Sequence, residues 1–230
     1  MPGHAQFIDR DDAGRQLGLA LKARGVDRPA IVLALPRGGV PVGARVAEAI
    51  DAPLDVCLVR KLGVPGQEEL AMGAIASGGA RALNRDVIVP LGIRPATIER
   101  VVARETAELH RREAAYRGDR RFPNLVGATV VLVDDGTATG ASMRVAVEAL
   151  REAGPRAVIA AVPVASRQAA RLLRSVSDEC ITIIEPEPFY AVGYWYADFA
   201  EVSDDEVRGV LDSARRHWDA SGPLHAEARR

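Results

Sequence analysis

Two adjacent acids stand directly before a run of small and hydroxyl-bearing residues in the segment VVLVDDGTATGAS, residues 130–142. Backbone N–H groups in such a loop can close around a phosphate, and the positive end of the following helix dipole strengthens the attraction. The carboxylates of Asp134 and Asp135 are poorly suited to a phosphate, but they suit hydroxyl groups or a bound cation beside it. A ribose 5-phosphate offers a phosphate group to the loop and hydroxyl groups to the carboxylates. A solvated strand end with a helix cap is the simpler alternative.

Two further segments place phosphate-binding residue types after apolar runs. The first is LPRGGV, residues 35–40, in which Gly38 and Gly39 would let backbone N–H groups approach a ligand closely. An ordinary tight turn between a strand and a helix would look the same. The second is VRK, residues 59–61, in which Arg60 could contact two phosphate oxygens and Lys61 could act as a point charge.

The elements that must position these residues follow an alternating β-α-β pattern. Continuous apolar runs predict buried parallel strands at 30–35, 54–59, 129–133, 158–164 and 180–184. Helical periodicity between them predicts helices at 11–24, 40–50, 96–117, 140–153 and 167–175. We therefore expect an α/β fold with a doubly wound, mostly parallel sheet. Ligands of such sheets bind at the carboxyl ends of the strands, where all three segments fall.

We expect residues 1–230 to form a single domain with a core of about residues 25–185. Two regions of it depart from the alternating β-α-β pattern. Residues 60–85 are rich in glycine and predict a mobile loop leading into a small antiparallel hairpin. Residues 186–217 hold an aromatic segment and then a final helix, 204–217, which begins with a capping box formed by Ser203 and Glu206.

The acid pair and its loop resemble the phosphoribosyl pyrophosphate (PRPP) motif of the type I phosphoribosyltransferases, over about residues 30–165. The order of segments, with AVGYWYADF near the end, is also similar to a group of bacterial phosphoribosyltransferase-like proteins. In that family the acids hold the ribose hydroxyls and the loop grips the 5-phosphate. The resemblance thus implies that PRPP is bound by Arg37, Gly38, Gly39, Arg60, Lys61, Asp134, Asp135, Gly136, Thr137, Ala138, Thr139, Gly140, Ala141 and Ser142.

The resemblance also implies a reaction in which an acceptor displaces pyrophosphate at the anomeric carbon of PRPP. The catalytic residues would be Arg60, Lys61, Asp134 and Asp135. Mg²⁺ would be the cofactor, held by Asp134 indirectly through PRPP and water. The 60–79 loop would close over the site to exclude water.

The acceptor is a small molecule that the sequence does not identify, a nucleobase being one candidate. Aromatic side chains that could stack on a flat base are Phe189, Tyr190, Tyr194 and Trp195. The alternative is that they form a hydrophobic cluster that ties the tail to the core. Ala138 stands where purine-salvage members often have an acid, which argues against that particular mechanism.

Three other functions compete with transfer. A non-catalytic PRPP- or nucleotide-binding regulatory protein would keep the same pocket. A phosphatase of the haloacid dehalogenase type would need an aspartate nucleophile where the chain has Val133. A dinucleotide-binding dehydrogenase is disfavoured because GGVPVG, residues 38–43, does not match the required glycine spacing.

Composition limits the cellular location and the classes of partner that we expect. A net charge of -1 over 230 residues argues against a nucleic-acid binder with a broad basic field. No apolar stretch reaches the roughly 20 residues needed to span a membrane, and the start of the chain lacks signal-peptide features. Cys57 and Cys180 lie in apolar runs and suggest buried thiols rather than a disulfide. We therefore expect a cytoplasmic protein, and the family resemblance suggests a homodimer.

Overall fold

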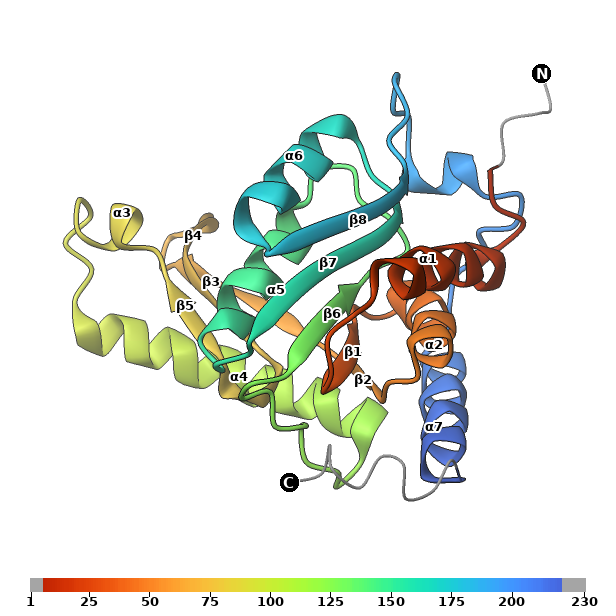
Figure 1. The fold of residues 1–230 in the computed structure, drawn as a ribbon. Helices are drawn as coiled ribbons and strands as arrows, with labels where there is room; N and C mark the ends of the chain where they lie inside the picture. The colour runs from red at the N-terminus through yellow and green to blue at the C-terminus, as the bar shows by residue number, and fades with distance from the viewer. Residues whose placement is uncertain (1–5, 221–230) are drawn as a thin grey trace.

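The computed structural model describes residues 6–220, so the two ends of the predicted single domain, 1–5 and 221–230, lie outside it. At its centre is a parallel five-stranded sheet in the order β2-β1-β6-β7-β8 (Figure 1). Its strands are β1 (Ala30–Ala34), β2 (Leu54–Val56), β6 (Thr129–Val133), β7 (Ala157–Val164) and β8 (Glu179–Ile184). All five predicted strands are present, although β2 ends earlier than expected. The predicted doubly wound α/β fold is confirmed.

Helices cover both faces of this sheet because alternate residues of the buried strands point to opposite sides. α1 (Arg10–Arg24) and α2 (Gly39–Ile50) pack on the face that carries Val32, Val131 and Ile159. α5 (Ala141–Arg151) and α6 (Arg167–Val176) pack on the other face. Both faces are therefore apolar, which explains the continuous rather than alternating hydrophobicity of the strands.

The segment after β2 forms a second, antiparallel sheet instead of a loop. It contains β3 (Val59–Val64), β4 (Gln67–Ala76) and β5 (Arg81–Leu83), with the 3-10 turn η1 (Ser77–Gly79) before β5. The predicted antiparallel hairpin is present, and residues 60–64, where the sequence predicted the start of a mobile loop, are paired with β4. The chain leaves the parallel sheet at Leu58, whose N–H donates to Ser77 Oγ at 2.9 Å.

Two helices complete this side of the molecule. α3 (Arg85–Ile88) is short, and α4 (Pro95–Arg117) runs the length of the small sheet and on beneath the parallel sheet (Figure 1). An apolar cluster that includes Leu62, Met72 and Leu109 joins α4 to β3 and β4. The small sheet is thus packed on a long helix rather than exposed as a flap.

The C-terminal segment returns across the sheet end. It contains η2 (Val192–Trp195) and α7 (Asp204–Ala220), which packs on α2 and β2. The predicted capping box is present, because Glu206 N–H donates to Ser203 Oγ and Ser203 N–H donates to the Glu206 carboxylate. Near η2, Ala197 N–H donates to the Phe7 carbonyl and Phe7 N–H donates to the Trp195 carbonyl, so residues from the two ends of the described chain lie side by side.

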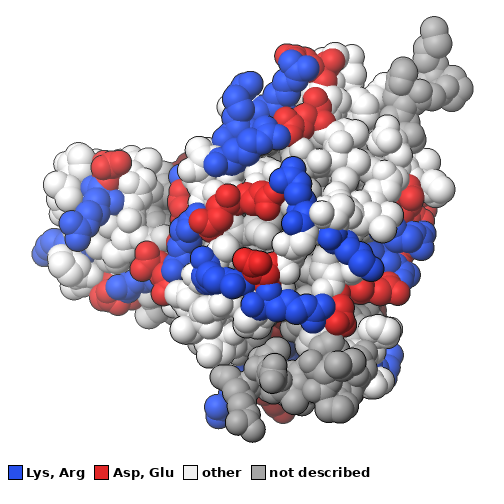
Figure 2. Space-filling view, viewed as in Figure 1, with Lys and Arg blue, Asp and Glu red and all other residues white. Residues whose placement is uncertain are grey.

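The two cysteines are free thiols, with Cys57 buried and Cys180 half-buried. Burial raises the pKa of Cys57 to about 12. Among the described residues no helix is both long and apolar enough to cross a bilayer. Lys and Arg lie among Asp and Glu over much of the described part of the face in Figure 2.

A buried ion-pair group at the end of α4 fastens that helix to the parallel sheet. Arg117 is buried, its Nε donates to Asp55 Oδ1 at 2.8 Å and its Nη2 donates to the Val56 carbonyl at 2.8 Å. Glu113 lies 3.1 Å from Arg117 Nη1. Removing the arginine would leave buried carboxylates without their counter-charge.

We predict that Arg117→Met lowers the free energy of unfolding by about 3 kcal/mol, because the Asp55 carboxylate would lose its buried partner. Denaturant titration followed by circular dichroism measures this. Arg111→Met on the same helix is the matched control, since Arg111 is exposed and its ion pair is with Glu108 on its own helix. The control should unfold at the wild-type denaturant concentration, and equal loss in both variants would contradict the assignment.

Candidate functional site

The acid pair and the glycine loop meet where β6 and β1 end side by side. Leu35 N–H donates to the Val133 carbonyl at 2.8 Å, which brings the loop after β1 next to the acids. A side chain on Gly39 would come within 2.8 Å of the Val133 carbonyl oxygen, and one on Gly38 would overlap Asp135 Oδ2. Only residues without a Cβ allow this approach. The Pro36–Arg37 peptide bond in the same loop is cis.

Electrostatics make this acid pair unusual. Burial and the adjacent Asp135 raise the pKa of Asp134 well above its ordinary value. Burial also raises the pKa of Asp135, and the guanidinium of Arg10 opposes that rise. Two neighbouring carboxylates in a poorly hydrated place resist being ionised together. A ligand that supplies hydroxyl donors or a cation would relieve this repulsion, so the pair is suited to polar or cationic partners.

The loop after the acids presents backbone donors at the start of α5. Gly140 N–H donates to Thr137 Oγ1 at 2.9 Å, and Ala141 N–H donates to Thr139 Oγ1 at 3.3 Å. The loop is fixed to the segment after β7, because Ser166 Oγ donates to the Ala138 carbonyl at 2.6 Å. A phosphate could replace the two threonine hydroxyls as the acceptor for these N–H groups, at the positive end of the helix.

The glycine loop and Asp135 border one open cavity of about 520 Å³. Asp135 and Gly38 line it together with residues of the C-terminal segment. The full lining consists of Arg10, Arg37, Gly38, Asp135, Val192, Phe199, Glu201 and Val202. The cavity combines cationic, anionic and apolar walls, which fits a ligand with more than one kind of chemical group.

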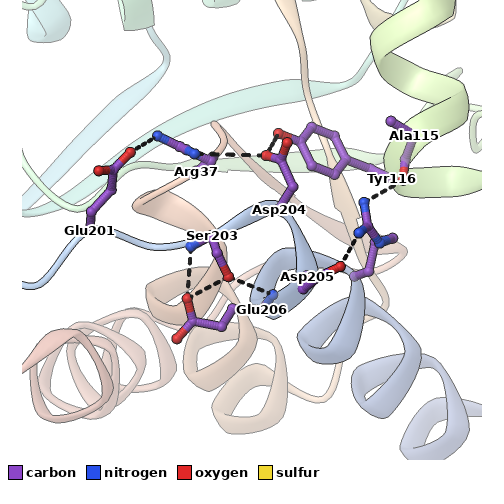
Figure 3. A network of polar contacts seen from close by, with 9 residues as sticks. Arg37, Ala115, Tyr116, Glu201, Ser203, Asp204, Asp205 and Glu206 are labelled. Atoms are coloured by element: carbon purple, nitrogen blue, oxygen red, sulfur yellow. Dashed lines mark hydrogen bonds and ion pairs between the residues drawn. The ribbon is translucent and has the colours of Figure 1, made fainter.

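Arg37 belongs to a polar network that joins the glycine loop to the C-terminal segment (Figure 3). Its guanidinium pairs with Glu201, and Asp204 lies 4.0 Å from Nη1. Tyr116 Oη on α4 donates to the same Asp204 at 2.6 Å. Both ion pairs of Arg37 are largely exposed, so a phosphate group could compete for this arginine at modest cost.

The two other predicted cations are placed differently from the expectation. β2 ends at Val56, so Arg60 and Lys61 do not end a strand of the parallel sheet but lie in β3 of the second sheet. Arg60 Nη2 donates to the Glu105 carboxylate on α4 at 2.5 Å, and that carboxylate is almost fully buried. Lys61 Nζ lies 3.2 Å from the exposed Glu69. The apolar run of residues 54–59 gave no sign that β2 ends at Val56, because the contact of Leu58 with Ser77 is made by a residue 19 positions away.

The C-terminal aromatics divide into two groups. Phe189 and Trp195 pack with Phe7 and Tyr196 in a small apolar cluster, as the structural alternative anticipated. Tyr190 is 67% exposed and Tyr194 also faces solvent, with ring centres 5.1 Å apart. The four aromatics singled out from the sequence are absent from the lining of the cavity beside Asp135, which is formed instead by Val192 and Phe199.

Sequence reasoning missed several lining residues: Arg10, Val192, Phe199, Glu201 and Val202. Phe199 lies in the aromatic segment that the sequence analysis singled out, so it could have been predicted as a candidate lining residue. Arg10 carried no local signal, because it lies 125 positions before Asp135 and reaches it only through the packing of α1.

A metal ion would not find a complete set of protein ligands here. Within residues 6–220, no group of three or more His, Cys, Asp or Glu side chains could hold one. Asp134 and Asp135 together supply carboxylate oxygens, the ligand type that Mg²⁺ prefers. The site therefore fits Mg²⁺ only if a bound ligand and water supply the remaining oxygens.

Glycine loop, acid pair and small-residue loop at adjoining ends of parallel strands define a protein of the phosphoribosyltransferase fold class. Residues 19–197 match the phosphoribosyl transferase domain family, and the chain belongs to that family. The crystal structure of the protein TT1426 from Thermus thermophilus is similar at 43% identity with a TM-score of 0.80, covering 90% of this chain and 97% of that one.

Curated relatives come from two strains of Mycobacterium tuberculosis, CDC 1551 and H37Rv, and both are named "Putative phosphoribosyl transferase". Each is 43% identical over 222 residues, which is 96% of this chain and 50% of the relative. The chain thus spans about half the length of the curated relatives that it matches. The similarity extends over nearly all of the chain, including the candidate site.

We predict that Gly38→Ala displaces the Asp135 carboxylate and lowers the free energy of unfolding by about 1–3 kcal/mol, because the added methyl overlaps Oδ2. Thermal unfolding and a crystal structure of the variant measure the two effects. Gly209→Ala on α7 is the control, since a Cβ there meets nothing within 4 Å. That change should be neutral or slightly stabilising in a helix. A Gly38→Ala variant as stable as Gly209→Ala would refute the close approach.

Proposed function

We propose that the protein binds PRPP with Mg²⁺ and transfers its 5-phosphoribosyl group to a small-molecule acceptor, with release of pyrophosphate. The observation that carries this proposal is the close approach of the glycine loop to the acid pair. It brings a candidate pyrophosphate loop (Arg37, Gly38 and Gly39) next to candidate ribose ligands (Asp134 and Asp135). The family match of residues 19–197 supports the same function.

In this proposal each loop holds one part of the donor. Asp134 and Asp135 accept hydrogen bonds from the ribose hydroxyls, which relieves the repulsion between the two carboxyls. The backbone N–H groups of Gly140 and Ala141, which now donate to the Thr137 and Thr139 hydroxyls, bind the 5-phosphate at the start of α5. The full set of proposed PRPP contacts remains the set predicted from the sequence, residues 37–39, 60–61 and 134–142.

Stabilisation of the departing pyrophosphate would come from Arg37 in the glycine loop and from the cations predicted in β3. Arg37 can leave its exposed partner Glu201, and Lys61 can leave the exposed Glu69. Arg60 is held by the nearly buried Glu105, which makes it the weaker candidate of the two predicted catalytic cations. A bound Mg²⁺, attached to Asp134 through the donor and water, would neutralise further charge on the leaving group. Catalysis would rest on positioning and charge stabilisation.

The acceptor-binding surface that we propose is formed by Val192 and Phe199, which line the same cavity as Asp135. A flat, partly apolar acceptor such as a nucleobase would suit these side chains. The predicted contacts through Phe189, Tyr190 and Trp195 would require the C-terminal segment to move. A cytoplasmic location and a homodimer stay predictions from the sequence and the family.

A second candidate function is a regulatory protein that binds PRPP without turning it over. The observation that favours it is the engagement of Arg60 by Glu105 and of Asp135 by Arg10, which leaves two predicted catalytic groups occupied by protein partners. Binding without turnover would distinguish this function from transfer.

We predict that calorimetric titration with PRPP shows micromolar binding, about −8 kcal/mol, only when Mg²⁺ is present. Asp134→Asn and Asp135→Asn should each abolish this binding, because an amide cannot accept both hydrogen bonds or balance a cation as a carboxylate does. Asp86→Asn on α3 serves as the control and should bind as the wild type does. Retained affinity in both acid-pair variants would show that the ribose assignment is wrong.

The same preparation tests transfer. Pyrophosphate release is measured with PRPP and a panel of nucleobases, small amines and water as acceptors. Release with one acceptor class supports the transferase, whereas tight binding with no release by any acceptor supports the regulatory protein. Absence of PRPP binding would overturn both.

A further inference from the structure

One charged side chain from outside the three ligand loops reaches the acid pair. Arg10, the first residue of α1, donates from Nε to Asp135 Oδ2 at 2.8 Å. Both side chains are mostly shielded, at 12% and 14% exposure. Arg10 lies before residue 19, where the match to the phosphoribosyl transferase domain family begins. This contact is therefore supplied by a part of the chain that the family pattern does not include.

Arg10 also holds the C-terminal side of the cavity. Its Nη1 donates to the Ala200 carbonyl at 2.7 Å, and its guanidinium carbon lies 3.9 Å from the ring centre of Phe199. A planar guanidinium can make these contacts together because its donors point in several fixed directions. Arg10 thus joins Asp135 to residues 199–200 of the C-terminal segment.

The segments that contain Phe7 and Tyr196, near the two ends of the described chain, hold the backbone of Asp135. Tyr196 Oη donates to the backbone carbonyl of Asp135 at 2.5 Å. Tyr196 is buried against Phe7, with ring centres 5.2 Å apart, and backbone hydrogen bonds join residues 7–8 to 195–198. Asp135 is therefore held at its carboxylate by Arg10 and at its carbonyl by Tyr196.

We propose that Arg10 is a positioning residue for the ribose half of the site. It holds the Asp135 carboxylate against Gly38 and keeps residues 199–202 beside it at the same cavity. The role of the carboxylate toward ribose rests on the proposed function, whereas the holding of Asp135 does not. A shielded carboxylate needs a fixed counter-charge to keep one orientation, and the Arg10 contact supplies it. Arg10 does not touch the reacting atoms in this assignment.

The test compares Arg10→Met with Arg15→Met on the same helix, where Arg15 is largely exposed and pairs with Asp11. Methionine keeps much of the unbranched stem near Phe199 while removing the charge. Calorimetry measures the affinity for PRPP with Mg²⁺ and, separately, for inorganic pyrophosphate with Mg²⁺. We expect Arg10→Met to weaken PRPP binding about 10- to 100-fold and to change pyrophosphate binding less than about twofold. Arg10→Lys should restore part of the PRPP affinity, and Arg15→Met should match the wild type.

A ligand-free crystal structure of Arg10→Met gives a readout that is independent of the proposed function. We expect the Asp135 carboxylate to leave Gly38 and residues 199–202 to shift. Unmoved Asp135 and residues 199–202 overturn the inference, as does an equal loss of affinity for PRPP and pyrophosphate or an unchanged affinity for PRPP. If the wild type binds no PRPP, the proposed function fails, and the crystal structure alone still decides the role of Arg10.

Discussion

The candidate site depends on the close contact between a glycine loop and a shielded pair of carboxylates. Gly38 and Gly39 let the backbone after β1 lie directly against Asp134 and Asp135 after β6. The two strands must be neighbours and must run parallel for this to occur, and both conditions are met in the sheet. The carboxylates resist ionisation together, so the site is poised for a ligand that brings hydroxyl groups or a cation.

Around this contact, the arginines that line the cavity are paired within the protein. Arg10 pairs with Asp135, and Arg37 pairs with Glu201. The two pairs differ in burial, since the first is shielded and the second is exposed. Exposed pairs contribute little to stability and exchange partners easily, whereas shielded pairs fix geometry. This difference assigns a structural task to Arg10 and leaves Arg37 available to a phosphate.

Membership in the phosphoribosyl transferase domain family fits this geometry without naming the acceptor. Val192 and Phe199, which line the same cavity as Asp135, belong to the C-terminal segment and not to the strand-end loops. Because that segment is fastened to the start of α1 by backbone hydrogen bonds, both ends of the described chain shape the cavity. The acceptor preference would therefore depend on regions at the edges of the family match or beyond it.

The sequence alone determined the succession along the chain of the five parallel strands and the helices between them. It also determined that the acid pair lies at the end of a strand. These features follow from local patterns: continuous apolar runs, helical periodicity and the residue types in turns. Only the tertiary structure decided which charges meet. Arg60 and Lys61 looked like the end of a sheet strand but lie in β3, because the chain turns away at Leu58 through a contact with Ser77. Arg10 reaches Asp135 through helix packing over 125 positions, and no local pattern encodes a pairing at that separation.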